Sequence, residues 1–162
     1  MPQVRIERWT DADLPILRAA NVPQMMEHLG GPETDEKVLA RHQRYLDLGI
    51  GDMFRIVLLP EGEPVGIVGY WERTWQDEAV YETGWSVLPP FQGRGIAPGA
   101  VVEVLAAARG AGGRRQVHAF PSVGNAPSNA ICRKVGFMFV GEYDFEYPPG
   151  HQMRCNDWRF DL

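Results

Sequence analysis

The chain has 162 residues, of which 44% are hydrophobic, and it carries a formal net charge of −5 at pH 7. This length and composition predict one domain, residues 1–162, with one sizeable core. The negative charge and the lack of a basic run argue against nucleic acid as a partner. The sequence has neither an apolar stretch of membrane-spanning length nor a signal-peptide core, so we expect a cytoplasmic protein with no membrane partner.

The first fifty residues favour one strand followed by two helices. A strand is expected at 4–9 and a helix at 11–20, where an N-cap and acidic residues open the pattern. After a loop, Thr34 caps a second amphipathic helix, which Gly49 ends. His42 lies on the apolar face of this helix, and the sequence predicts a hydrogen-bonded, half-buried histidine there.

The next segment reads as three strands. Residues 54–59 and 64–71 form two of them, joined by a turn at 60–63. A connection at 73–78 then leads to a central strand at 81–88, which is rich in aromatic and β-branched residues. Two prolines directly after this strand end the ladder, because proline has no N–H to donate.

The stretch Gln92-Gly93-Arg94-Gly95-Ile96-Ala97 separates the central strand from a helix whose apolar residues recur at helical spacing between Val101 and Ala108. Glycines let the backbone turn sharply and approach a ligand closely. The helix that follows directs its unpaired N–H groups and the positive end of its dipole into the same space. The sequence therefore predicts an anion site, here for a pyrophosphate.

Three phosphate-binding turns share this kind of glycine pattern. A P-loop requires Gly-Lys followed by Ser or Thr, whereas Gly95 is followed by Ile96. A dinucleotide fingerprint requires glycine where Pro98 stands and a carboxylate about twenty residues further on, which is missing. These mismatches argue against a nucleotide-binding oxidoreductase. A surface turn without a ligand remains the alternative.

A second motif follows a buried strand at 116–120. Asn125 is a natural N-cap, Ser128 lies in the first helical turn, and Gly136 can end the helix in a left-handed conformation. Two strands, 137–145 and 153–161, then close the chain around a Tyr-Pro-Pro-Gly turn. The order of elements favours an α+β fold with a mixed sheet.

The two motifs together resemble the GNAT superfamily of N-acyltransferases. Gln-x-x-Gly-x-Ala after a strand that ends in Val-Leu-Pro is similar to the acyl-CoA pyrophosphate loop of that family. The Asn-x-x-Ser helix that ends in Gly-Phe is similar to the ribosomal-protein N-terminal acetyltransferase branch. The resemblance covers residues 54–162 well and the first fifty in layout. It implies a mostly antiparallel central sheet flanked by helices, in the order strand, helix, helix, three strands, helix, strand, helix, two strands.

The resemblance also implies an acetyl-CoA site. The backbones of Val87 and Leu88 match the strand residues that pair with the pantetheine arm, and Asn125 and Ser128 match polar residues beside the arm and the thioester. The pyrophosphate loop is matched by Gln92, Gly93, Arg94, Gly95, Ile96 and Ala97.

Two residues depart from the family pattern. Pro98 removes one N–H donor from the phosphate site. Cys132 stands where many members carry a tyrosine proposed to protonate the leaving thiolate, so a tyrosine acid is excluded at this position. Cys132 and Cys155 lack the spacing of metal ligands, so no metal is expected, and each is predicted to be a reduced residue of the core or its margin.

Acetyl transfer to an amine needs a route for a proton, because the amine attacks only when neutral and is mostly protonated near neutral pH. Glu82, upstream of the loop on the central strand, is the candidate base, with a solvated glutamate as the alternative. A backbone N–H near Ser86 or Val87 would stabilise the oxyanion. Ser128 would hydrogen-bond the sulfur of the departing CoA, with helix capping as its alternative.

These residues favour an N-acetyltransferase that moves an acetyl group from acetyl-CoA to a primary amine by direct attack in a ternary complex. The alternative is a non-catalytic acyl-CoA-binding sensor module. The acceptor is left open between a protein N-terminus, an antibiotic, a small amine and an amino acid. Whether the chain forms a homodimer is also left open.

Overall fold

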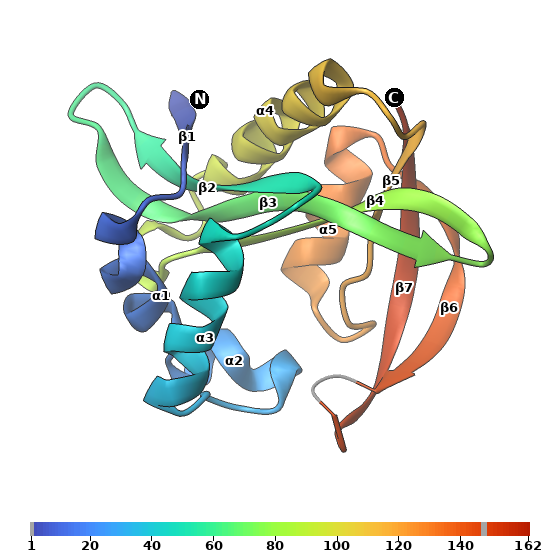
Figure 1. Cartoon of the computed structure of the whole chain (residues 1–162), viewed down its shortest axis with the longest axis horizontal. Helices are drawn as coiled ribbons and strands as arrows, with labels where there is room; N and C mark the ends of the chain where they lie inside the picture. Colours follow the sequence, from blue (N-terminus) through green and yellow to red (C-terminus); the bar gives the residue numbers. More distant parts are fainter. Residues whose placement is uncertain (1, 147–148) are drawn as a thin grey trace.

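One seven-stranded sheet runs through the computed structural model, which describes residues 2–146 and 149–162 (Figure 1). The strand order is β1-β2-β3-β4-β5-β7-β6, and every neighbouring pair is antiparallel except β4 and β5, which are parallel. The expected mixed, mostly antiparallel α+β sheet is therefore confirmed. The strands are β1 Val4–Arg8, β2 Gly51–Leu58, β3 Glu63–Trp75, β4 Glu78–Val87, β5 Gln116–Ala119, β6 Met138–Glu146 and β7 Gln152–Asp161.

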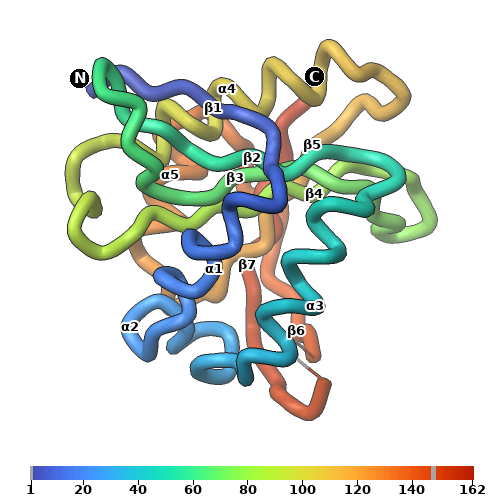
Figure 2. Tube along the Cα trace, turned by 60° about the vertical axis from the view of Figure 1, so that its left-hand side comes forward, coloured from blue at the N-terminus to red at the C-terminus, as the bar shows by residue number. Residues whose placement is uncertain are grey.

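Helices pack on both faces of this sheet. One face carries α4 and α5, and the other carries α1 and α3 beneath β2 and β3 (Figures 1 and 2). The helices on the second face leave the β5, β7 and β6 side of the sheet uncovered (Figure 1). The helices are α1 Leu14–Ala20, α2 Pro23–Met26, α3 Asp35–Leu46, α4 Ile96–Ala111 and α5 Ala126–Val135.

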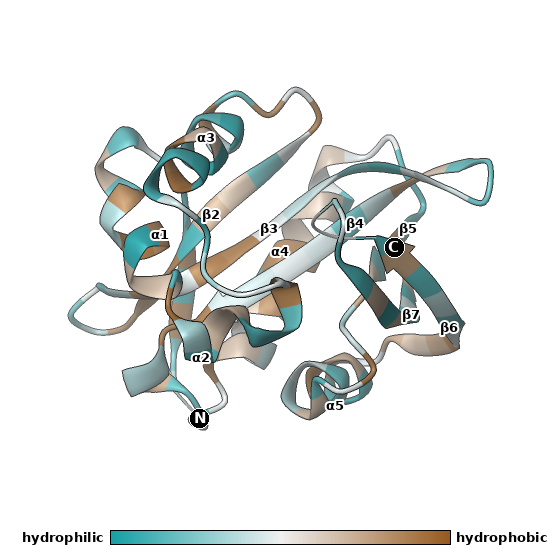
Figure 3. Ribbon diagram, turned by 90° about the horizontal axis from the view of Figure 1, so that it is seen from below, coloured by the Kyte–Doolittle hydropathy of each residue, from teal (hydrophilic) through white to brown (hydrophobic). Residues whose placement is uncertain are grey.

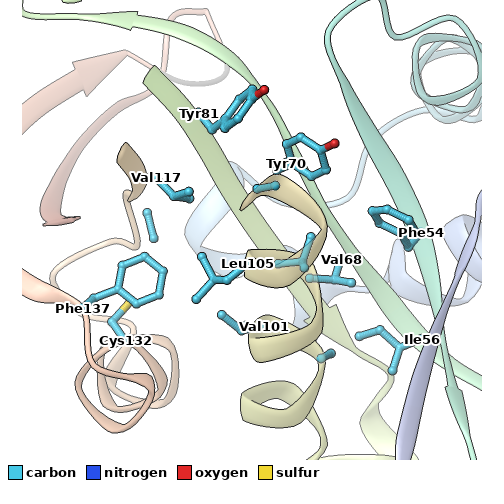
Figure 4. Close-up of a cluster of buried hydrophobic side chains, with 14 of the residues drawn as sticks. Phe54, Ile56, Val68, Tyr70, Tyr81, Val101, Leu105, Val117, Cys132 and Phe137 are labelled. Atoms are coloured by element: carbon cyan, nitrogen blue, oxygen red, sulfur yellow. The ribbon is translucent and has the colours of Figure 1, made fainter. Parts of the chain in front are cut away.

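The larger core holds α4 against the centre of the sheet (Figure 4). Tyr70 of β3 and Tyr81 of β4 make an edge-to-face contact, with ring centroids 5.0 Å apart, and pack with Val101 and Leu105 of α4. Such aromatic contacts favour one relative orientation of the elements that carry them. The first half of β4 and the middle of α4 are thereby fixed relative to each other.

Local signals set the helix ends as the sequence indicates. Thr34 accepts a hydrogen bond from the N–H of Lys37 at 3.3 Å and so caps α3. Asn125 caps α5, and Gly136 ends α5 with a φ of +107°. His42 is buried and accepts a hydrogen bond from the indole N–H of Trp9 at 2.9 Å, so the expected structural histidine is confirmed.

The chain departs from the expected elements in three places. Helix α3 ends at Leu46 with Asp47 as its C-cap, three residues before the expected end at Gly49. Pro23–Met26, in the expected loop, forms the short helix α2, because proline is well suited to the first helical position. The expected connection at 73–78 is instead part of a hairpin, since β3 continues to Trp75 and β4 begins at Glu78. Gln76 and Asp77 turn the chain with positive φ angles of 50° and 66°, as a two-residue primed turn requires.

Further expectations concern the cysteines, the last turn and membranes. Cys132 and Cys155 are both free and buried, as predicted. The Tyr-Pro-Pro-Gly turn at 147–150 lies partly outside the described residues. Among the helices of the described ranges, none is long and apolar enough to cross a membrane. Figure 3 shows how hydrophilic and hydrophobic residues are distributed along these helices and strands.

The buried side chain of Asn129 ties α5 to β7. Its Oδ1 accepts hydrogen bonds from Nδ2 of Asn156 and Nε1 of Trp158, both at 2.8 Å. Its Nδ2 donates to the backbone carbonyls of Ser122 at 3.0 Å and Asn125 at 2.8 Å. One amide thus joins the helix, the strand beneath it and the segment that leads into the helix.

We predict that Asn129→Ala lowers the free energy of unfolding by about 2 to 4 kcal/mol, because it leaves buried donors and carbonyls without partners. Urea unfolding followed by circular dichroism measures this. Ala130→Ser, at the exposed neighbouring position, should cost no more than about 0.5 kcal/mol. A loss below about 1 kcal/mol for Asn129→Ala would show that the amide does not hold α5 in place.

Candidate active site

A gap opens in the sheet between β4 and the segment that follows β5. The two strands pair at only two positions in the described chain, the second being Glu82 beside His118. Beyond this point β4 continues to Val87 alongside β3. The chain after β5 follows β7 instead, through a bridge between Ser122 and Cys155. Backbone groups on one edge of β4 therefore face the gap rather than a neighbouring strand.

The hydrogen-bond alternation of β4 decides which residues face the gap. The N–H of Leu88 donates to the carbonyl of Val65 on β3 at 2.8 Å, so the N–H of Ser86, two residues earlier, also points toward β3. The N–H and C=O of Val87 point the other way. The Val87 carbonyl accepts from Nε2 of Gln92 at 2.9 Å. Of the two expected oxyanion donors, only Val87 has its N–H directed into the gap.

The first turn of α4 lies at the end of this gap. The sequence placed Ile96 and Ala97 in the loop, but they begin α4 and their side chains are buried, so only their backbone N–H groups can reach a ligand. Gly95 is the N-cap, with a φ of +77° and no side-chain cap. Pro98 has no N–H, so three of the four free donors of a helix start remain.

The residues before α4 fit a diphosphate group. Gly93 has a φ of +75°, and a Cβ at this position would meet nothing within 4 Å, so the turn has room beside it. Arg94 is exposed, and its guanidinium lies 5.5 Å from the ring centroid of Phe91. Free N–H donors, a nearby cation and open space are what an anion at a helix start requires.

Glu82 lies where the gap begins, on the face of the sheet opposite α4. Its side chain is 19% exposed, and its Oε1 accepts a hydrogen bond from Nη1 of Arg73 at 2.6 Å. Burial raises the pKa of Glu82, while Arg73, a hydrogen bond from Trp71 and the nearby His118 act in the opposite direction. The carboxylate is therefore largely withdrawn from water, unlike a solvated strand glutamate.

Arg73 was missed by the sequence reasoning, which placed it in a connection. Its guanidinium lies 5.2 Å from the ring centroid of Trp75, 4.6 Å from that of Phe120 and 5.2 Å from that of Phe145. These rings come from β3, from the segment directly after β5 and from β6, so they meet only in the folded protein. A signal was present in the sequence, because Trp71, Arg73 and Trp75 alternate as strand residues on one face do.

A buried pair, His118 and Asp157, was also missed. Nδ1 of His118 lies 2.5 Å from Oδ1 of Asp157, and Nε1 of Trp75 donates to Oδ2 of Asp157 at 3.0 Å. Asp157 is fully buried, and His118 is 4% exposed. The two residues are 39 positions apart, so no local pattern could predict their contact. His118 faces the same side of the sheet as Glu82, its neighbour across the β4–β5 pair.

Ser128 lies in the first turn of α5, on the face of the sheet that α4 and α5 cover. Its backbone N–H donates to Oδ1 of Asn125 at 3.2 Å, so Asn125 is the cap and the Ser128 hydroxyl is not needed for that role. Within the described residues this hydroxyl has no hydrogen-bond partner, and Ser128 is half-buried. Glu82 and Ser128 therefore belong to opposite faces of the sheet.

Cys132, at the position where many relatives carry tyrosine, is fully buried. Burial raises the pKa of its thiol to about 12. An ordinary thiol has a pKa near 8.5, so a proton would not pass readily from Cys132 to a leaving thiolate. The cysteine therefore cannot replace the tyrosine as an acid. In the described ranges, no group of three or more His, Cys, Asp or Glu residues could hold a metal ion.

The two buried thiols should resist alkylation in the folded protein. Burial raises the pKa of Cys132 to about 12 and that of Cys155 to about 11, so the thiolate that reacts is scarce at pH 8. Iodoacetamide at pH 8 should modify neither residue on a timescale that modifies both in urea, as mass spectrometry measures. Rapid labelling of either cysteine in the folded state would contradict the buried environment.

Comparison with known proteins places this geometry in a family. The family model described as an acetyltransferase (GNAT) domain matches residues 3–138. No curated protein matches the sequence.

Among solved structures, the Salmonella typhimurium acetyltransferase that modifies the N-terminal serine of ribosomal protein L7/L12 is 18% identical, with a TM-score of 0.77 over 98% of this chain and 95% of that chain. A GNAT acetyltransferase from Bacillus anthracis is 18% identical, with a TM-score of 0.78 over 100% and 98% of the two chains. The microcin C7 self-immunity acetyltransferase MccE, in complex with acetyl-CoA and AMP, is 15% identical, with a TM-score of 0.79 over 99% and 93%. These structures share the fold, and the family match spans most of the sequence, so the chain belongs to the GNAT acetyltransferases and is an enzyme that uses acetyl-CoA.

Proposed function

We propose that the protein transfers the acetyl group of acetyl-CoA to a primary amine by direct attack in a ternary complex. One observation carries the proposal: a largely buried carboxylate, Glu82, lies where β4 and β5 part, and the same strand leads to the uncapped start of α4. The proposed proton acceptor and the proposed anion site would thus lie at the two ends of one gap. A primary amine is also what the Salmonella typhimurium neighbour modifies, at an N-terminal serine.

Different residues would bind the different parts of acetyl-CoA. The N–H groups of Gly95, Ile96 and Ala97 would bind the pyrophosphate at the positive end of α4. The gap edge of β4 at Val87 would pair with an amide group of the pantetheine arm. Leu88, the other residue expected to pair, is not free to do so, because its N–H is bonded to the carbonyl of Val65 and its carbonyl accepts from the N–H of Phe91 at 2.9 Å. Flanking positions complete the proposed site: Gln92, Gly93 and Arg94 in the turn, and Asn125 and Ser128 at the start of α5.

Glu82 would accept the proton that the amine must lose. The neutral amine then attacks the thioester carbon, the carbon–nitrogen bond forms and the carbon–sulfur bond breaks, so that CoA leaves with the electron pair of that bond. The second proton of the nitrogen passes to this thiolate, directly or through water, so the products are the amide and the CoA thiol. The N–H of Val87 would stabilise the oxyanion on the way. A raised pKa suits this role, because a base works best when its pKa approaches the working pH.

Ser128 would donate a hydrogen bond to the departing sulfur. A hydroxyl is too weak an acid to supply a proton freely near neutral pH, so its role is stabilisation. A non-catalytic acyl-CoA sensor would need the same phosphate site but would have no use for a buried carboxylate beside the thioester. A Glu82 variant that loses turnover but still binds CoA would favour the enzyme over the sensor.

We predict that Gly95→Glu abolishes CoA binding, because it forces a side chain and a negative charge into the phosphate site and strains a backbone with a φ of +77°. Titration calorimetry with CoA should show at least a hundredfold weaker binding, a loss of roughly 3 kcal/mol. Gly110→Glu, a matched change near the other end of α4 with nothing within 4 Å of the new Cβ, should bind normally. Unchanged affinity in a folded Gly95→Glu variant would remove the basis of the proposed phosphate site.

We predict that Glu82→Gln lowers turnover by roughly a hundredfold or more while CoA binding stays nearly constant, since the amide cannot accept a proton. The loss should shrink as pH rises, because more of the acceptor amine is then neutral. Ser128→Ala should lose on the order of tenfold with little pH dependence, since no titrating group is removed.

The pH profile of the wild-type enzyme gives an independent check on Glu82. Burial raises the pKa of this carboxyl, so kcat/KM should fall as pH drops through the raised pKa, where Glu82 becomes protonated and cannot act as a base. Glu82→Gln should lose the limb that Glu82 causes and keep only the rise that follows deprotonation of the acceptor amine. Wild-type turnover of Glu82→Gln at neutral pH with a saturating acceptor would place the base elsewhere.

A further inference from the structure

Arg73 presents part of its guanidinium to solvent beside the proposed base. Three aromatic rings surround it, and its side chain is 31% exposed. Its Nη1 is bonded to Glu82, whereas Nε and Nη2 make no hydrogen bond within the described residues and are not among the buried polar atoms that lack partners. The rings hold the cation in place, and two kinds of donor on it remain available.

The charges on this face of the sheet are matched among themselves. Glu82 is paired with Arg73, and Asp157 is bonded to His118. Cys155, which is near Glu82, stays neutral because burial raises its pKa to about 11. An acceptor with only an ammonium group must compete with Arg73 for Glu82. If it succeeds, it leaves a partly buried cation without a partner, which is unfavourable.

An acceptor that carries a carboxylate next to its amine avoids this difficulty. Its ammonium can bond to Glu82 while its carboxylate binds the free donors of Arg73, whose planar fork matches a carboxylate. One ion pair is then exchanged for two, and neither protein charge is left alone.

We propose that the acceptor is an amino carboxylate, an amino acid or a close analogue, and that Arg73 binds its carboxylate. This inference rests on the proposed acetyl transfer through Glu82. A site that uses buried polar groups to bind one substrate group discriminates strongly against analogues that lack it. Arg73 would thus select the acceptor, and its ion pair with Glu82 would be the state of the site before the acceptor binds.

The test compares the standard amino acids with their carboxamides, which keep the amine and the side chain but lose the carboxylate. Release of free thiol from acetyl-CoA is the readout. We expect kcat/KM for the preferred amino acid to exceed that of its carboxamide by at least tenfold. The carboxamide has the more acidic ammonium and so more neutral amine, which works against the expected preference and makes the comparison conservative.

The variants separate substrate binding from general damage. Arg73→Gln also removes a partner of Glu82, so both acceptors should lose activity, but the acid should lose at least tenfold more than the carboxamide. Arg73→Lys keeps the positive charge but lacks the planar guanidinium, so it should retain part of the preference for the acid over the carboxamide. This variant also tests the proposal if Arg73→Gln fails to fold. Arg154→Gln removes an exposed cation of β7 that is paired with Glu142 and Asp144, and it should leave kcat/KM unchanged for both the acid and the carboxamide.

Two results would overturn the proposal. One is a wild-type enzyme that uses carboxamides or simple amines as well as amino acids, or no amino acid at all. The other is an equal loss for acid and carboxamide in the Arg73 variants. Either result leaves the acetyl transfer itself untouched, because its failure would be seen separately as a lack of CoA binding in calorimetry or as full activity of Glu82→Gln.

Discussion

The parting of β4 and β5 is the constraint on which the rest of the site depends. Two parallel strands that stayed paired would consume the N–H and C=O groups that β4 turns toward the gap, and no arm of acetyl-CoA could bond there. The chain after β5 is drawn away because it pairs with β7, where the N–H of Asn156 donates to the carbonyl of Pro121 at 2.9 Å. Asn129 then holds α5 against β7 through its hydrogen bonds to Asn156 and Trp158. The gap is thus a consequence of hydrogen bonds made elsewhere, and its backbone groups are left for a ligand.

The two faces of the sheet differ in chemistry for a related reason. Strand residues alternate, so the positions of β3, β4, β5 and β7 that do not pack beneath α4 and α5 all emerge on the other face. There α1 and α3 cover the part beneath β2 and β3, and side chains rather than a helix fill the remainder. Glu82 and Asp157 are withdrawn from water on that part, and each is matched by a basic partner, as carboxylates in a low-dielectric environment require. These carboxylates therefore lie on the face of the sheet that α4 and α5 do not cover, and Glu82 lies where the gap begins.

Sequence reasoning succeeded where structure is local. The helix starts and ends at Thr34, Asn125 and Gly136 depend on residues within one turn of each other, and the family motifs are runs of a few residues. It failed where contact depends on register. Arg73 meets Glu82 only because Gln76 and Asp77 form a two-residue turn, and that pair lacks the Asn-Gly or Asp-Gly signature of such turns. Glu82 was proposed from its place on the strand before the loop motif, but the groups that surround it could not be predicted from the sequence.

The balance of proton transfers would explain why the proposed base has more elaborate surroundings than the hydroxyl proposed to face the sulfur. A thiol of ordinary pKa near 8.5 is a fair leaving group near neutral pH, whereas an amine with a pKa between about 8 and 10 must lose a proton before it can attack. The harder transfer is therefore at the amine. The proposed roles follow this order, because three groups that tune the pKa of Glu82 surround its carboxylate, whereas Ser128, proposed for the sulfur, offers one hydroxyl. Cys132, which stands in place of the usual tyrosine, is buried and neutral, so in the proposed mechanism the protein supplies no acid for the less demanding transfer.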